Sequence, residues 1–151
     1  MERRNRISAG AIVIHDDRIL LVRCSDIPGK TYLVAPGGGV EIEEGLSQAV
    51  VREVKEETGI DVVQEKILCV EDLYWRKYRI SKVWFLCRMI GGELERTQGA
   101  IDEGIIEAKW YAKEELKRET VYPRIIAESD WAAFFKDSWQ TRYLELEYAH
   151  F

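Results

Sequence analysis

The chain has 151 residues, of which 46% are hydrophobic and 32% are charged, a composition typical of a globular protein and not of a disordered segment. This length predicts a single domain over residues 1–151 with enough chain to bury a core. The net charge of −5 argues against broad electrostatic binding of nucleic acid. Cys24, Cys69 and Cys87 have no CxxC spacing, so we expect reduced thiols in a cytoplasmic protein.

The first predicted element is a β-hairpin formed by residues 7–14 and 18–24. The apolar run over residues 7–14 is interrupted by Ser8 and Gly10 and is too short to cross a membrane, so we expect no membrane partner. Residues 18–24 are almost continuously apolar, as expected of a strand covered on both faces. The polar residues His15–Asp17 supply the turn between the two strands.

A third strand, a glycine loop and a helix come next. The strand over residues 31–35 ends at Pro36, which is followed by three glycines at positions 37–39. Glycines allow unusual backbone dihedral angles and a close approach of the backbone to a ligand. We expect a helix over residues 45–58, and Gly59 is typical of the residue that ends a helix.

The predicted helix carries its acids beside its buried face. Three apolar side chains form one stripe that must face a core, namely Leu46, Val50 and Val54. Glu53, Glu56 and Glu57 lie within about 100° of arc at the border of that stripe. Clustered carboxylates repel one another and resist desolvation, whereas a divalent cation would stabilise them. The alternative interpretation is a charged helix face in contact with solvent.

The remaining chain alternates strands and helices, which predicts a mixed β-sheet flanked by helices. The expected elements are strands over 61–74, 80–90 and 105–111, a loop over 91–104, and helices over 112–119 and 124–137. Leu144, Leu146 and Tyr148 alternate with glutamates, as in a half-buried edge strand. Such an edge suits pairing between subunits, so we expect the segment over residues 121–151 to pack on the domain or to lie at a homodimer interface.

A specific spacing connects the glycine loop with the helix. Gly38, Glu44 and residues 52–60 match G-x5-E-x7-R-E-U-x-E-E-x-G-U, with U an aliphatic residue, at all nine specified positions. This pattern resembles the signature of the Nudix hydrolases. The resemblance implies an α/β fold, the Nudix-type α/β/α sandwich. It also implies metal-dependent hydrolysis of a diphosphate linkage in a nucleoside diphosphate derivative, by attack of water at phosphorus.

The resemblance also assigns roles to residues. Glu53, Glu56 and Glu57, together with the backbone of Gly38, would bind Mg²⁺, with Mn²⁺ as a substitute. Glu53 is in addition a candidate base, acting directly or through a water on the metal, and Arg52 would orient the carboxylates.

Two other acidic positions leave alternatives open. Glu44 would either form a salt bridge with Arg52 or act through the electrostatics of the helix start. Many relatives take a further acid from a later loop as base or ligand, and here the candidates are Asp102, Glu103 and Glu107. We choose Glu103, which the alternative interpretation treats as an exposed loop residue.

Candidate substrate contacts come from two segments outside the signature. Residues 74–82 combine aromatic side chains with Arg76, Lys77, Arg79 and Lys82, and such residues suit phosphate binding and base stacking, although an exposed hairpin tip looks similar. The substrate contacts that we predict are Arg23, Trp75, Arg76 and Tyr78. Tyr78 resembles a tyrosine of diadenosine polyphosphate hydrolases, whereas the proline usual in the ADP-ribose subgroup is absent.

We therefore expect a small-molecule nucleotide-type substrate, either a nucleoside triphosphate or a dinucleoside polyphosphate. Two alternatives have lower weight. Non-catalytic nucleotide sensors on this fold commonly have incomplete signatures, and this signature is complete. Isoprenoid diphosphate isomerases of the family need additional acid and cysteine positions, and the three cysteines of this chain do not form such a motif.

Overall fold

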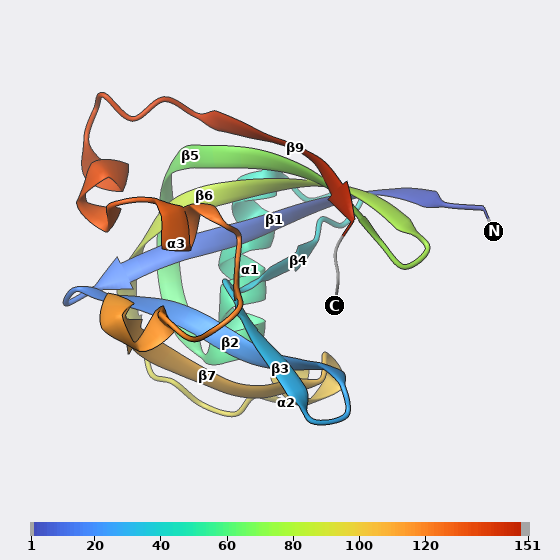
Figure 1. Ribbon diagram of the computed structural model, residues 1–151, viewed down its shortest axis with the longest axis horizontal. Coiled ribbons are helices and arrows are strands. Elements are labelled where there is room, and N and C mark those ends of the chain that lie inside the picture. The colour runs from blue at the N-terminus through green and yellow to red at the C-terminus, as the bar shows by residue number, and fades with distance from the viewer. Residues whose placement is uncertain (1, 149–151) are drawn as a thin grey trace.

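The fold is a curled, mixed β-sheet with the long helix α1 and the short α2 on one face, and α3 and two 3₁₀ helices on the other (Figure 1). The computed structural model describes residues 2–148, without the side chains of residues 26 and 27. The strands are β1 (Arg4–His15), β2 (Arg18–Ile27), β3 (Lys30–Val34), β4 (Gly37–Gly39), β5 (Ile60–Trp75), β6 (Tyr78–Gly92), β7 (Ile105–Ala112), β8 (Val121–Tyr122) and β9 (Arg142–Tyr148). The helices are α1 (Leu46–Thr58), α2 (Gln98–Asp102) and α3 (Ile125–Glu128), and Lys113–Leu116 and Trp131–Phe135 form 3₁₀ helices.

The sheet separates into two halves between β1 and β2. The strand order is β8-β3-β2-β1-β6-β5-β9, with β4 also paired to β1 and β7 to β2. Strand β1 runs antiparallel to β2 and parallel to β6, so the sheet is mixed. In the described residues β1 and β2 pair at Ile14–Ile19 and His15–Arg18 and then diverge. The two halves therefore diverge beyond the hairpin, and Figure 1 shows the ribbons of β1 and β3 apart from each other.

The predicted hairpin is confirmed, and its turn has a physical cause. Asp16 and Asp17 have φ angles of 50° and 60°, the left-handed region that two-residue hairpin turns require. Aspartate adopts this region more readily than most residues because its short polar side chain forms local hydrogen bonds. The turn fixes the point from which β1 and β2 diverge.

Helix α1 covers one face of the sheet with the stripe that the sequence predicts. Val50 and Val54 are fully buried, and Leu46 is partly buried against the same cluster. This cluster also contains Ala9 and Phe85 from the strands beneath the helix. Burial of each valine contributes about 2 kcal/mol to stability, which holds α1 in place. Gly59 ends the helix with a φ of 82°, a conformation that side chains disfavour.

The C-terminal segment covers the opposite face and differs from the prediction. The single helix predicted over residues 124–137 is wrong, because the chain is extended at Ser129 and the Asp130 side chain accepts a hydrogen bond from Ala132 N, starting a new 3₁₀ turn. Small polar residues favour such caps over a helix interior. The helix predicted over 112–119 is similarly reduced to the 3₁₀ helix Lys113–Leu116.

The segment after residue 121 nevertheless contributes large side chains to the core. Ile125, Ile126 and Phe134 are fully buried in the cluster that also contains Trp84 and Leu86 of β6. Strand β9 then pairs with β5 in parallel at one end of the sheet. The homodimer at this edge stays a prediction, and the last three residues of the 121–151 segment lie outside the described residues.

The loop predicted over residues 91–104 contains one short helix that the sequence analysis did not identify. Helix α2 begins after Thr97, whose hydroxyl accepts a hydrogen bond from Ala100 N at 2.9 Å. The Thr97 hydroxyl also donates to the Glu56 carbonyl, which ties α2 to the end of α1. In the described residues no helix is both long and apolar enough to span a membrane.

Candidate active site

The glycine loop and α1 form the centre of the site. Strand β4 pairs with β1, with Gly38 opposite Ala9, and this pairing holds the glycine loop next to α1. A Cβ atom on Gly38 would lie 2.6 Å from the carboxyl carbon of Glu53, so a side chain at this position would displace that carboxylate. Gly37 N donates a hydrogen bond of 3.3 Å to Glu57 Oε2. The glycines therefore place backbone directly beside two carboxylates.

Both of these carboxylates are withdrawn from water. The exposed fraction is 6% for Glu53 and 4% for Glu57, whereas Glu56 lies at the surface. Burial raises the pKa of Glu53, and burial together with the charge of Glu53 raises the pKa of Glu57 well above its ordinary value. Two neighbouring carboxylates in a region of low dielectric are unfavourable unless a proton or a cation stabilises them.

Arg52 holds the acids of the site together. Its Nη1 atom donates to Glu53 Oε1 at 3.0 Å and to Glu56 Oε2 at 3.1 Å. Its Nε and Nη2 atoms donate to the two oxygens of Glu44 at 2.6 and 2.8 Å, and Nη2 also reaches the Gly39 carbonyl at 3.1 Å. Glu44 therefore forms the salt bridge with Arg52 that the sequence analysis left open.

The site has the donors that a hard divalent cation prefers. Carboxylate oxygens and a backbone carbonyl are typical ligands of Mg²⁺ and Mn²⁺. Within residues 2–148, no three Asp, Glu, His or Cys side chains are already gathered as a metal-ligating group, and Arg52 holds Glu53 and Glu56. The burial of Glu53 and Glu57 side by side is the observation that suits a cation, since it would offset their repulsion.

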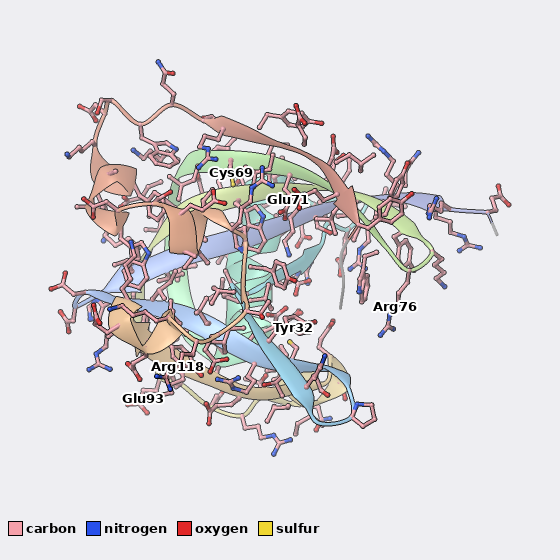
Figure 2. All side chains as sticks on the ribbon, in the orientation of Figure 1. Tyr32, Cys69, Glu71, Arg76, Glu93 and Arg118 are labelled. Carbon is pink, nitrogen blue, oxygen red and sulfur yellow. The ribbon has the colours of Figure 1, made fainter. Side chains whose placement is uncertain are left out.

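A cleft of about 260 Å³ opens beside the glycine loop, between the two halves of the sheet. Gly37, Gly38 and Glu57 form one end of it. Aromatic side chains from several elements line its walls, namely Tyr32, Trp75, Trp84, Tyr122 and Tyr148. In Figure 2, Glu71 lies on the half that contains β5 and Tyr32 on the half that contains β3. A cleft with acids at one end and aromatic walls suits a phosphorylated aromatic ligand.

The structure separates the predicted substrate contacts. Trp75 lines the cleft, while Arg76 and Tyr78 lie at the tip of the β5–β6 hairpin against the Trp75 ring (Figure 2). Arg23 points to the face of β2 opposite Val22 and Cys24, which line the cleft. There its Nη2 atom donates to Glu119 Oε1 at 2.7 Å.

The three later acids also have different surroundings. Glu103 ends α2 and lines the cleft together with Glu57. Asp102 accepts a hydrogen bond from Gln98 at 2.8 Å. Glu107 lines a second hollow of about 280 Å³, which Glu57 and Ile105 also line. Glu57 therefore lines two cavities, and Glu103 shares with it the one that has aromatic walls.

Other residues of the cleft were not selected from the sequence. Glu71 accepts a hydrogen bond of 3.1 Å from Trp84 Nε1, and Arg6, Lys82 and Arg124 bring positive charge into the lining. The available signal was the alternation along β6, where Lys82 stands between Ile80 and Trp84 at inward positions. This alternation identifies Lys82 as a cleft residue only when it is known which face of β6 borders the cleft.

The fold and the carboxylate-bearing helix define a domain of the Nudix type, and comparisons with known proteins agree. The sequence profile of the NUDIX domain matches residues 4–131. The chain therefore belongs to the Nudix family, as the sequence analysis predicted. In the same way the α/β sandwich fold is confirmed.

Individual relatives carry different names. An ADP-ribose pyrophosphatase of Methanocaldococcus jannaschii is 36% identical over 91 residues, covering 59% of this chain and 54% of the relative. A human 8-oxo-dGDP phosphatase is 34% identical over 102 residues, covering 66% of this chain and 30% of the relative. The chain thus spans about a third to a half of the length of these curated relatives. The crystal structure of a MutT protein from Methanosarcina mazei superimposes with a TM-score of 0.66 at 27% identity, covering 85% of this chain and 94% of that one.

Proposed function

We propose that this protein hydrolyses a diphosphate linkage in a nucleoside diphosphate derivative, with a divalent metal ion as cofactor. The observation that supports this most directly is the buried pair Glu53 and Glu57 beside the backbone of Gly37–Gly38, with Glu57 in the lining of an aromatic cleft. The family to which the chain belongs supports the same reaction class.

The residues that would hold the cation are Glu53, Glu56, Glu57 and the backbone of Gly38. We propose Mg²⁺, with Mn²⁺ as a substitute, because all of these ligands are oxygen atoms. The cation supplies neutralisation of charge on the phosphoryl oxygens and makes the attacking water more acidic. Arg52 keeps Glu53 and Glu56 in position through hydrogen bonds of 3.0 and 3.1 Å.

The proton of the attacking water goes to a carboxylate of the site. Glu53 is our first choice for this base, since its burial raises its pKa and so makes it a better proton acceptor when it is ionised. Glu103 is the second choice because it borders the cleft together with Glu57. The nucleoside part of the substrate then lies against the aromatic walls, where Trp75 and Tyr148 stand nearest the hairpin tip.

A nucleoside triphosphate or a dinucleoside polyphosphate is the substrate that we propose. The names of the relatives add ADP-ribose and 8-oxo-dGDP to the compounds to test. The 260 Å³ cleft is continuous from the glycine loop to the aromatic walls, which suits a molecule with a phosphate chain at one end and a base at the other.

The test is a turnover screen with Mg²⁺ and with Mn²⁺. It covers nucleoside triphosphates, dinucleoside polyphosphates, nucleotide sugars, ADP-ribose and 8-oxo-dGDP, with Glu53→Gln as the inactive control. We expect selective hydrolysis that falls by about 100-fold or more in the variant, the usual contribution of a general base. Absence of turnover across the panel, with ligands still raising the thermal stability, would contradict hydrolysis and favour a nucleotide sensor.

A further inference from the structure

Lys82 lines the cleft from β6, the middle one of three neighbouring strands. Strand β6 pairs with β1 on one side and β5 on the other, and Lys82 stands in register with Ser8 and with Glu71. Ser8, Lys82 and Glu71 all line the cleft, so the three side chains form a row across three neighbouring strands. The next strand in this row is β4 of the glycine loop, where Gly39 is in register with Ser8.

The ammonium group of Lys82 has no ion pair in the described part of the chain. Its contact is with the face of the Trp84 ring, whose centroid lies 4.2 Å from Nζ. Burial lowers the pKa of Lys82, while the charges of Glu57, Glu71 and Glu53 act on it from a longer range and oppose this shift. A cation that has lost much of its hydration without a contact partner is unfavourable, so an anion in the cleft would stabilise it.

The simplest alternative is that Lys82 only balances the neighbouring acids. Direct pairing would serve that role best, since the attraction between charges in a site of low dielectric increases steeply at contact. Glu71 is in register with Lys82, yet its carboxylate accepts a hydrogen bond from Trp84 Nε1 at 3.1 Å. The carboxylate of Glu57 accepts a hydrogen bond from Gly37 N. Among the described residues the ammonium group thus lies over the Trp84 ring, in the lining of the cleft, and forms an ion pair with neither carboxylate.

We propose that Lys82 is a substrate-binding residue whose ammonium group donates to a phosphate oxygen of the bound nucleotide. This inference rests on the proposed function, because it takes the ligand to be a phosphorylated nucleoside. Gly37, Glu57 and Lys82 line the same cleft, and Lys82 follows Ser8 in the row that starts at β4, so a phosphate chain held beside the glycine loop lies in the cleft that this cation borders. The carboxylates of α1 are themselves unsuited to contact phosphate, whereas a lysine binds it directly.

The experiment compares Lys82→Met and Lys82→Arg with the wild type. Lys117→Met is the matched control, since Lys117 is exposed and pairs with Glu114 on the protein surface. Equilibrium binding is measured with α,β-methylene-ADP and with inorganic pyrophosphate, each with and without Mg²⁺. KM and kcat are measured for the best substrate of the wild type, and circular dichroism with thermal unfolding monitors the fold.

We expect Lys82→Met to weaken binding of both probes and to raise KM by about 10-fold to 100-fold, the range for one lost charge-assisted hydrogen bond. Lys82→Arg restores part of this loss, and the control variant binds as the wild type does. Should Lys82→Met fail to fold, Lys82→Gln replaces it, because glutamine keeps a polar group and a similar length.

Other results would overturn the inference. If Lys82→Met binds both probes as the wild type does and changes only Mg²⁺ affinity or stability, Lys82 serves only to balance the charge of the neighbouring acids. A wild-type protein that binds neither probe would also contradict it. Failure of the proposed function gives a different result. In that case the wild type binds α,β-methylene-ADP, and Lys82→Met weakens this binding, but the wild type hydrolyses no compound of the panel.

Discussion

Arg52 contacts both carboxylate oxygens of Glu44, through Nε at 2.6 Å and Nη2 at 2.8 Å. The two residues come from different segments, since Arg52 lies in the middle of α1 and Glu44 precedes the helix. Their pairing fixes the guanidinium group, whose Nη1 atom is then available to Glu53 and Glu56. Glu44 is therefore a support for the geometry of the acids and does not itself line the cleft among the described residues.

A first prediction concerns pH. Hydrogen bonds from Arg52 lower the pKa of Glu44 from 4.5 to about 2. A lowered pKa means that the ionised carboxylate stabilises the fold above pH 4.5 and that this contribution is lost as the pH falls to about 2. We expect Glu44→Gln to unfold at lower denaturant concentration than the wild type at pH 7, and the difference to disappear near pH 2.

Denaturant unfolding at several pH values measures this effect. Glu43→Gln is the control, because Glu43 is exposed and takes no part in the hydrogen bonds of Arg52. An equal difference between Glu44→Gln and the wild type at every pH would show that the carboxylate charge is irrelevant.

A second prediction concerns the acids of α1. Glu56→Gln and Glu57→Gln should each reduce metal-dependent turnover by about 100-fold or more, since loss of a cation ligand removes several kcal/mol of transition-state stabilisation. The free energy of unfolding without metal should not fall in Glu57→Gln, because the substitution removes a buried charge beside Glu53. Steady-state kinetics and thermal unfolding provide the two measurements. Full activity in both variants would refute the assignment, and loss of the fold in both would favour a structural role.

A third prediction concerns the close approach at Gly38. In Gly38→Ala the new Cβ would lie 2.6 Å from the carboxyl carbon of Glu53, and the carboxylate must move. We expect a large loss of turnover and weaker binding of Mn²⁺, measured by electron paramagnetic resonance. Gly91→Ala is the matched control, since its Cβ would meet Asp61 Oδ2 at 3.6 Å, an ordinary contact. Normal Mn²⁺ affinity in Gly38→Ala would show that the loop does not set the position of Glu53.

A fourth prediction concerns the C-terminal segment. Phe134 is fully buried in the core, whereas the adjacent Phe135 is 52% exposed. Phe134→Ala should lower the free energy of unfolding by about 3–5 kcal/mol, the usual cost of removing a buried phenylalanine. Phe135→Ala should change it by less than about 1 kcal/mol. Equal effects in denaturant unfolding would show that the segment is not packed as part of the domain.

The central part of this architecture is predictable because its signals are local. The apolar stripe of α1 and the glycine that ends the helix depend on residues within a few turns, and both agree with the structure. The same holds for the turn at Asp16–Asp17. Local periodicity is weaker after residue 112, where Ser129 and Asp130 interrupt an otherwise helical pattern with capping interactions.

The substrate contacts were harder to predict because they depend on which face of a strand borders the cleft. Arg23 and Lys82 are both cations within apolar strands, and the sequence does not distinguish them. In the structure the neighbours of Arg23 line the cleft while Arg23 faces Glu119, and Lys82 itself lines the cleft. Side chains alternate between the two faces of a strand, and which face borders the cleft depends on the packing of the whole sheet.

The position of Glu57, in the lining of both the aromatic cleft and the second hollow, has a consequence for access to this carboxylate. In the proposed reaction a nucleotide that fills the aromatic cleft therefore covers Glu57 from one side, while the side that borders the second hollow stays open.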